Sequence, residues 1–127
     1  MNILELKNEM KMNPDLTATG MDKEHSRSFV KEREALLTYL DACNASIEWL
    51  SLVKRSREPN KKIGNTYRLK HLVERWYEAE HGKPMYVPQG AFIAAAYYMG
   101  LVGVQKPGTA ALYLNISSKS KINGKWI

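Results

Sequence analysis

The sequence has almost no cysteine and contains none of the short motifs that mark common enzyme classes. Its single cysteine, Cys43, excludes an internal disulfide and a zinc site built from several cysteines. Cys43 lies between apolar neighbours at helical spacing. We therefore expect its side chain to be buried and to pack as a small hydrophobe, rather than to act as a reactive thiol.

Residue patterns typical of catalytic and metal sites are also missing. There is no glycine-rich phosphate-binding loop and no Gly-x-Ser-x-Gly nucleophile turn. The histidines His25, His71 and His81 are far apart, and no two have metal-ligand spacing on one helix. His71 and Glu74 stand in the reverse order of the Glu-x-x-His pairs of carboxylate-bridged metal sites. We expect no catalytic residues, no metal or cofactor, and no enzymatic activity.

No hydrophobic run is long enough to cross a bilayer, which takes roughly 20 residues. The least charged stretch, 85–105, is interrupted by proline and glycine. Residues 1–7 lack the apolar core and small-residue cleavage site of a signal peptide. We expect a cytoplasmic protein with no membrane partner.

The composition predicts one folded domain, 1–127, with a basic surface. Of the 127 residues, 44% are hydrophobic and 25% are charged, which is typical of globular proteins. The net charge of +6 favours anionic partners, of which nucleic acid is the commonest. The basic residues gather in the segment 54–75 and in the tail 119–125, and they could equally form only a solvated face. The candidate nucleic-acid-binding residues are Arg55, Arg57, Lys61, Lys62, Arg68, Lys70, Arg75, Lys119 and Lys121.

The first half of the chain predicts two helices. Asn2 and Glu5 have the spacing of a capping box for a short helix, and a loop follows to residue 21. An apolar stripe at steps of three and four predicts a long amphipathic helix within 22–58. Three weak helix formers, Asp41, Asn44 and Ser46, could kink or split this helix. The stripe could pack within its own domain or seat a partner helix in a homodimer, and its members are Leu36, Leu40, Cys43, Ile47 and Leu50.

Residues 64–118 predict a helix, a turn, a second helix and a β-hairpin. Asn65 or Thr66 caps the first of these helices, and Gly82 ends it. The second helix, 88–99, carries no charge on any face, so we expect it to be the buried central helix of the core.

The C-terminal part predicts two short turns. Pro107-Gly108 has the pattern of a type II turn between strands at 101–105 and 112–117, which together make the hairpin. Asn123-Gly124 is a tight-turn dipeptide within the basic tail, 119–127.

These elements predict a mainly α fold: a compact helical bundle of about four helices with a C-terminal β-hairpin. The order of elements over 66–117 also matches the second half of a winged helix-turn-helix, with the hairpin as the wing. Two features argue against base reading by the helix 88–99. It has no Arg, Lys or Asn, and the preceding connection, 82–87, is longer than the usual turn.

Part of the chain resembles a group of short uncharacterised proteins of phages, plasmids and genomic islands. The similarity is carried by Tyr67-Arg68-Leu69-Lys70-His71-Leu72-Val73-Glu74-Arg75-Trp76, by Tyr86-Val87-Pro88-Gln89-Gly90-Ala91-Phe92-Ile93-Ala94-Ala95-Ala96, and by Gly100-Leu101. It covers about residues 64–118. No activity is assigned to that group, so the resemblance implies a mobile genetic element as the setting and transfers no site residues.

Small accessory proteins of such elements mostly bind nucleic acid or bind and inhibit another protein. We predict the first function, through a helix-turn-helix-like module and the basic segments, with DNA favoured over RNA as the partner. The alternative is an inhibitor of a host or rival system, of which an anti-CRISPR or other anti-defence protein is one case. Inhibitors of this kind act through surface shape and leave no motif in the sequence.

Overall fold

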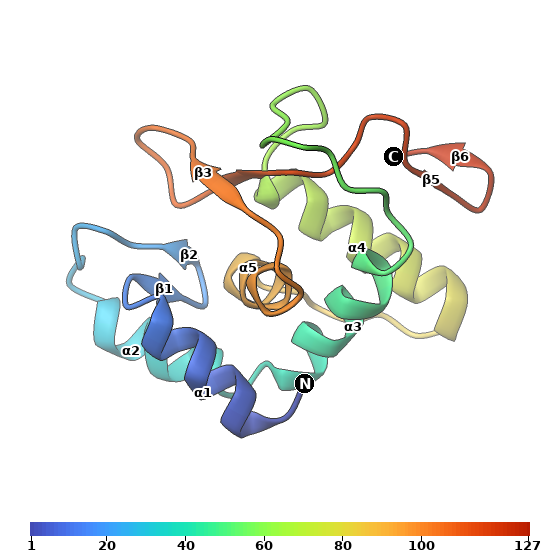
Figure 1. The fold of residues 1–127 in the computed structure, drawn as a ribbon. Helices are drawn as coiled ribbons and strands as arrows, with labels where there is room; N and C mark the ends of the chain where they lie inside the picture. The colour runs from blue at the N-terminus through green and yellow to red at the C-terminus, as the bar shows by residue number, and fades with distance from the viewer.

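The computed structural model describes residues 1–127 and places four helices and three small hairpins around a central helix, α5 (Figure 1). Each hairpin consists of two antiparallel strands. The elements follow one another as α1 (Ile3–Met12), β1 (Leu16–Thr17), β2 (Gly20–Met21), α2 (Phe29–Leu36), α3 (Leu40–Leu50), α4 (Thr66–His81), α5 (Gln89–Tyr98), β3 (Gly103–Gln105), β4 (Leu112–Leu114), β5 (Lys121–Ile122) and β6 (Lys125–Trp126).

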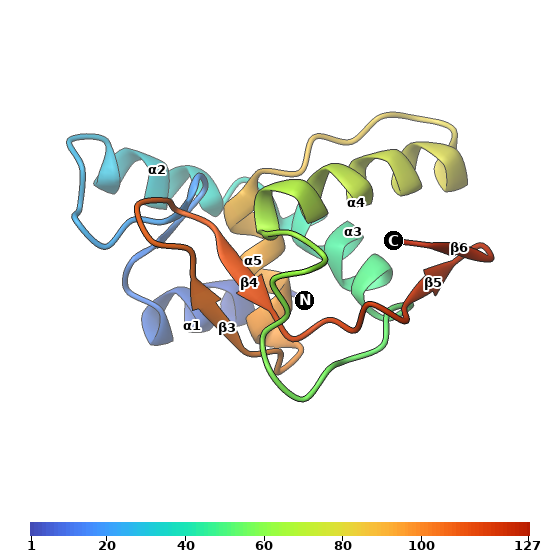
Figure 2. The same ribbon diagram turned by 90° about the horizontal axis from the view of Figure 1, so that it is seen from above.

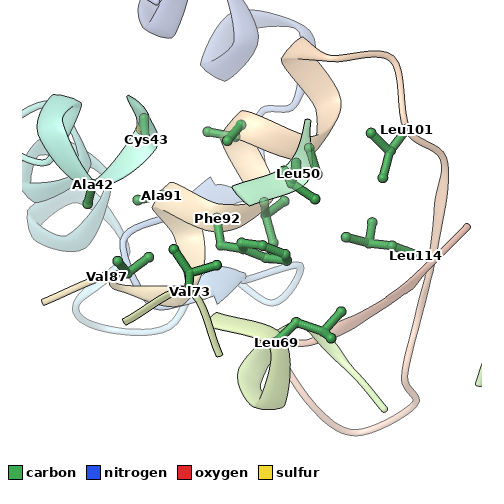
Figure 3. Close-up of a cluster of buried hydrophobic side chains, with 14 of the residues drawn as sticks. Ala42, Cys43, Leu50, Leu69, Val73, Val87, Ala91, Phe92, Leu101 and Leu114 are labelled. Carbon is green, nitrogen blue, oxygen red and sulfur yellow. The ribbon is translucent and has the colours of Figure 1, made fainter. Parts of the chain in front are cut away.

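The helix α5 is the centre of the core, as its uncharged sequence predicts. Every residue from Gln89 to Ala96 is buried, and the helix packs against α1, α3 and α4. Phe92 lies among side chains from three other elements, including Leu50, Leu69 and Leu114 (Figure 3). Its ring also meets that of Trp49 edge to face, with 5.9 Å between centroids.

The first turn of α5 touches the backbone of the β1–β2 hairpin. The amide of Gly90 donates a hydrogen bond to the carbonyl of Ala18 at 2.9 Å. A Cβ on Gly90 would lie 1.7 Å from the carbonyl oxygen of Thr17, so only glycine allows this approach. The prediction of a simple loop before residue 21 was therefore incomplete, because a small strand pair forms there.

The long helix predicted within 22–58 is split, as its weak helix formers allowed, but the break lies before them. The chain forms two helices there, α2 and α3, so the fold has five helices and not about four. The break lies at Thr38, whose hydroxyl donates to the carbonyl of Ala35 at 2.7 Å. The amides of Thr38 and Tyr39 also donate to the carbonyls three residues earlier, those of Ala35 and Leu36. This tighter hydrogen-bond pattern replaces the α-helical one and ends the helix. The weak helix former Ser46 lies inside α3, where its hydroxyl bonds to the carbonyl of Ala42.

The apolar stripe of this region packs inside the protein's own core. Leu36, Cys43 and Leu50 are buried, and Leu40 and Ile47 are half-buried against the same cluster. The α3 part of the stripe packs against α5. These side chains therefore pack within the domain, while a homodimer through residues 36–50 stays a prediction.

The predicted helix caps are present. Asn2 and Glu5 form both hydrogen bonds of the capping box at the start of α1. The Asn65 side chain accepts from the amides of Tyr67 and Arg68 at the start of α4. Gly82 ends α4 in the left-handed conformation, with φ of 70°. These local signals were therefore sufficient to set three of the helix ends.

The predicted C-terminal hairpin is confirmed as β3 and β4, in which Gly103 pairs with Leu114 and Gln105 with Leu112. The tail is also structured, since β5 and β6 pair across Asn123-Gly124, where both residues have positive φ. The Asn123 amide group donates to a Glu80 carboxylate oxygen at 3.2 Å, which connects this hairpin to the end of α4. None of the helices combines the length and the apolar character needed to cross a bilayer.

Cys43 is fully buried in this core, as predicted, and burial raises the pKa of its thiol to about 12. In the unfolded chain the thiol ionises near pH 8.5. The folded state therefore holds the proton more tightly, and its stability falls as the pH rises from about 8.5 towards 12.

We expect this thiol to lower the free energy of unfolding by up to about 1.4 kcal/mol per pH unit in that window. Urea unfolding at several alkaline pH values measures the slope, and Cys43→Ala is the control that removes the thiol. Equal slopes for the two proteins would contradict the prediction. At pH 8 the folded protein should also resist thiol reagents that label it fully in urea.

Candidate nucleic-acid interface

Two basic segments that are distant in the sequence lie side by side in the structure (Figures 1 and 2). The first comprises residues 54–62, between α3 and α4, and the second comprises residues 114–121, from the end of β4 to the start of β5. The amide of Ser117 donates to the carbonyl of Lys54 at 2.8 Å, and Arg55 forms a β-bridge with Ile116. We call the two paired segments the basic ribbon.

Further backbone hydrogen bonds extend the pairing in the same antiparallel sense. The amide of Ser56 donates to the carbonyl of Asn115 at 2.9 Å. The amide of Asn60 donates to the carbonyl of Leu114, also at 2.9 Å. The ribbon is therefore a defined extension of the β3–β4 hairpin rather than a pair of loose loops.

Polar side chains from both segments fix this arrangement. The Ser120 hydroxyl is buried, and it accepts from the Lys54 amide at 2.9 Å and donates to the Lys54 carbonyl at 3.2 Å. The Asn60 side chain donates to the carbonyl of Ile116 at 3.0 Å. The buried Asn115 accepts from the Val102 amide at 2.8 Å, which connects the ribbon to the start of β3. Buried polar groups of this kind hold one register because any other pairing leaves them without partners.

The ribbon carries the whole net charge of the protein. The chain has 19 Lys and Arg residues, of which seven lie in the ribbon, and 13 Asp and Glu residues, of which one lies there. The 12 basic and 12 acidic residues outside the ribbon therefore cancel. No cation of the ribbon takes part in an ion pair. Its single acidic residue is Glu58, and its basic residues are Lys54, Arg55, Arg57, Lys61, Lys62, Lys119 and Lys121.

The exposed cations of the ribbon differ in how freely they can move. The Arg55 guanidinium donates to the carbonyl of Met99 at 2.6 Å, so it is tied to the end of α5. The Lys61 ammonium lies 5.7 Å from the centroid of the Tyr113 ring, and that of Lys121 lies 4.2 Å from the Trp126 ring. These cations remain exposed to solvent and available to an anionic partner.

Three of the predicted binding residues, Arg68, Lys70 and Arg75, lie on α4 rather than in the ribbon. Arg68 stands beside the ribbon, because its guanidinium donates to the carbonyl of Ile63 at 2.6 Å. Arg75 is exposed two turns further along the same helix. The prediction omitted Lys54, although it opens the basic segment and pairs directly with the second one.

Lys70 was predicted to contact phosphate from the surface, and the structure corrects this. Lys70 is only 5% exposed, and its ammonium lies 3.4 Å from a Glu74 carboxylate oxygen. The same ammonium lies 5.6 Å and 4.9 Å from the ring centroids of Tyr67 and Tyr86. Lys70 therefore faces inward, because it lies four residues after the buried Thr66 and three before the buried Val73 on the same face of α4.

The helix that stands in the recognition position of a winged helix-turn-helix, α5, is buried along Gln89 to Ala96, in line with its lack of Arg, Lys and Asn. A helix reads base edges only when it can enter the major groove. The β3–β4 hairpin exists where a wing was predicted, but the helix before it forms the core instead of a binding surface. A base-reading role for α5 is therefore excluded in this conformation.

Other clusters of polar residues offer less chemistry. Three histidines each face one carboxylate: His25–Asp15 and His71–Glu74 at 2.8 Å, and His81–Glu48 at 3.4 Å. No three His, Cys, Asp or Glu side chains come together as metal ligands. A hollow of about 600 Å³ lies between the segment after β2 and the β3–β4 turn, and most of its lining residues are polar.

No protein-family model, curated protein or solved structure matches the chain.

Proposed function

We propose that this protein is a small basic accessory protein of a mobile genetic element and binds nucleic acid through the basic ribbon. The observation that carries the proposal is the pairing of two remote segments into one surface that holds the entire net charge. The protein would act by binding and not by catalysis, in the cytoplasm, with DNA favoured over RNA.

The chemistry of the ribbon suits the phosphate backbone. Six of its seven cations have no hydrogen bond to the protein, and an extended ribbon can place several of them along successive phosphates. Contacts of this kind release counterions and carry no sequence information. The helix α5 is buried and offers no side chains for groove reading, so we expect binding with little base preference.

Fluorescence polarisation with labelled 20-nucleotide DNA and RNA, single-stranded and duplex, tests this proposal. We expect binding at 50 mM salt and a roughly 10²- to 10³-fold loss of affinity at 200 mM salt, as about six phosphate contacts would give. Absence of binding to all four probes at 50 mM salt would overturn the proposal. That result would favour the alternative, a protein that binds and inhibits a host or rival protein.

A further inference from the structure

A pocket of about 310 Å³ opens beside the first turns of α4, between α2 and the connection that leads into α5. Its walls carry three tyrosines, Tyr39, Tyr67 and Tyr86, which come from three different parts of the chain. The rings of Tyr39 and Tyr86 meet edge to face, with 5.9 Å between their centroids. We call this the tyrosine pocket.

Two of these tyrosines are unusually open for aromatic side chains. Tyr67 is 58% exposed and Tyr86 is 62% exposed. An exposed ring loses apolar contacts with the core, while it remains free to stack on a planar ligand. Burial by a ligand would therefore stabilise both rings, and the pocket has the concave, aromatic character of a small-molecule site.

The base of the pocket holds the buried ammonium of Lys70. This group has three donors, but its one hydrogen bond, to Glu74, is long at 3.4 Å. A buried ammonium with so few partners is costly, so an acceptor atom entering the pocket would gain a strong hydrogen bond. The acceptors of a planar heterocycle, a carbonyl oxygen or a ring nitrogen, suit this donor.

The charges around the pocket disfavour an anionic ligand. Glu74 already balances Lys70, and Glu32 on α2 adds a second carboxylate to the lining. Burial raises the pKa of the Tyr86 hydroxyl, and the charges of Glu74 and Glu32 act in the same direction. A neutral aromatic group therefore suits the interior better than a phosphate.

The pocket follows the ribbon along the chain. Lys61 and Lys62 end the first ribbon segment, and Tyr67 lies in the first turn of the helix that follows. The Lys62 amide donates to the Asn60 side chain at 3.0 Å, which orders the end of that segment. A strand whose phosphates lie on the ribbon needs to continue only past the start of α4 to reach Tyr67.

We infer that the tyrosine pocket binds one unstacked nucleobase of a single strand whose phosphates lie on the ribbon, an inference that rests on the proposed function. The base stacks on Tyr67 and Tyr86 and accepts a hydrogen bond from Lys70. A base within a duplex is paired and stacked and cannot enter such a pocket. The protein therefore prefers single strands to duplexes of the same sequence.

Polarisation with one 20-nucleotide sequence, as a single strand and as a duplex, tests the inference at fixed salt. We expect the wild type to bind the single strand at least tenfold more tightly. The double variant Tyr67→Ala and Tyr86→Ala should bind the single strand roughly 10- to 100-fold more weakly, the range for loss of base stacking. Its affinity for the duplex should not change.

The control is Tyr98→Ala, which removes an exposed tyrosine that bonds to Glu5 on the far side of the core. It should leave both affinities unchanged. Equal binding of single strand and duplex by the wild type would overturn the inference while leaving the proposed function intact, and so would an unaffected double variant. No binding to either probe would overturn both.

Discussion

Replacing Lys54, Arg57, Lys61, Lys62 and Lys119 together by alanine is expected to abolish nucleic-acid binding. Each phosphate contact releases about one counterion, which favours binding, and each substitution removes one such contact. The affinity should therefore fall at least roughly 10³-fold at 50 mM salt. The slope of log affinity against log salt should flatten by about 4. Titration of a labelled 20-nucleotide strand at several salt concentrations measures both quantities. These side chains are exposed, so the fold should persist.

A matched variant separates the ribbon from net charge. Lys7, Lys11, Lys23, Lys31 and Lys83 are also exposed, lie outside the ribbon, and give the same change in charge when replaced by alanine. Long-range attraction alone is screened within about 10 Å at ordinary salt, so this variant should lose only a few-fold in affinity. Equal losses for the two variants would contradict a localised interface.

Gly90→Ala is expected to destabilise the protein strongly, although the same change usually stabilises a helix by up to about 1 kcal/mol. The new Cβ would lie 1.7 Å from the Thr17 carbonyl oxygen and within 3 Å of the Ala18 carbonyl carbon, both backbone atoms. Either α5 or the β1–β2 hairpin must move, and the hydrogen bond from the Gly90 amide to Ala18 is lost. We expect a loss of roughly 3 kcal/mol or more in the free energy of unfolding.

Urea unfolding followed by circular dichroism measures this loss. Gly82→Ala is the matched control, because a Cβ there meets nothing within 4 Å and strains only a left-handed backbone. It should cost roughly 1–2 kcal/mol. A Gly90→Ala protein as stable as the wild type would show that α5 and the hairpin are not in the close contact described.

Features that depend on neighbouring residues were predictable from the sequence. The uncharged run of α5 indicated burial because no face of the helix carries a charged side chain that would need water. The caps at Asn2, Asn65 and Gly82 were predictable because each group bonds within one helical turn. The Pro107-Gly108 turn likewise set the position of the β3–β4 hairpin.

The break between α2 and α3 was not predictable from periodicity. The apolar stripe continues across Thr38 in phase, so it gives no sign of an interruption. The break depends on the Thr38 hydroxyl competing for the Ala35 carbonyl and on the packing of α3 against α5. Weak helix formers such as Ser46 indicated the wrong place because their hydroxyls can bond within the helix itself.

The candidate site, like the fold, was predictable from the sequence only where it depends on residues close together along the chain. Charge composition located both basic segments, but nothing local indicates that they pair. That pairing rests on Asn60, Asn115 and Ser120, whose partners lie up to 66 residues away along the chain. The inward position of Lys70 was missed because a lysine is normally exposed. Its pairing with Glu74 is a local i,i+4 contact, whereas its contact with the Tyr86 ring becomes evident only in three dimensions.

The central claim is that two distant segments form one nucleic-acid interface. The most direct test is an NMR titration of ¹⁵N-labelled protein with a 20-nucleotide strand at 50 mM salt. We predict that backbone amides of residues 54–62 and 114–121 shift together and give one dissociation constant, while those of α1 and α2 away from the pocket stay unchanged. Shifts in only one segment, or shifts concentrated elsewhere with neither segment affected, would contradict the claim.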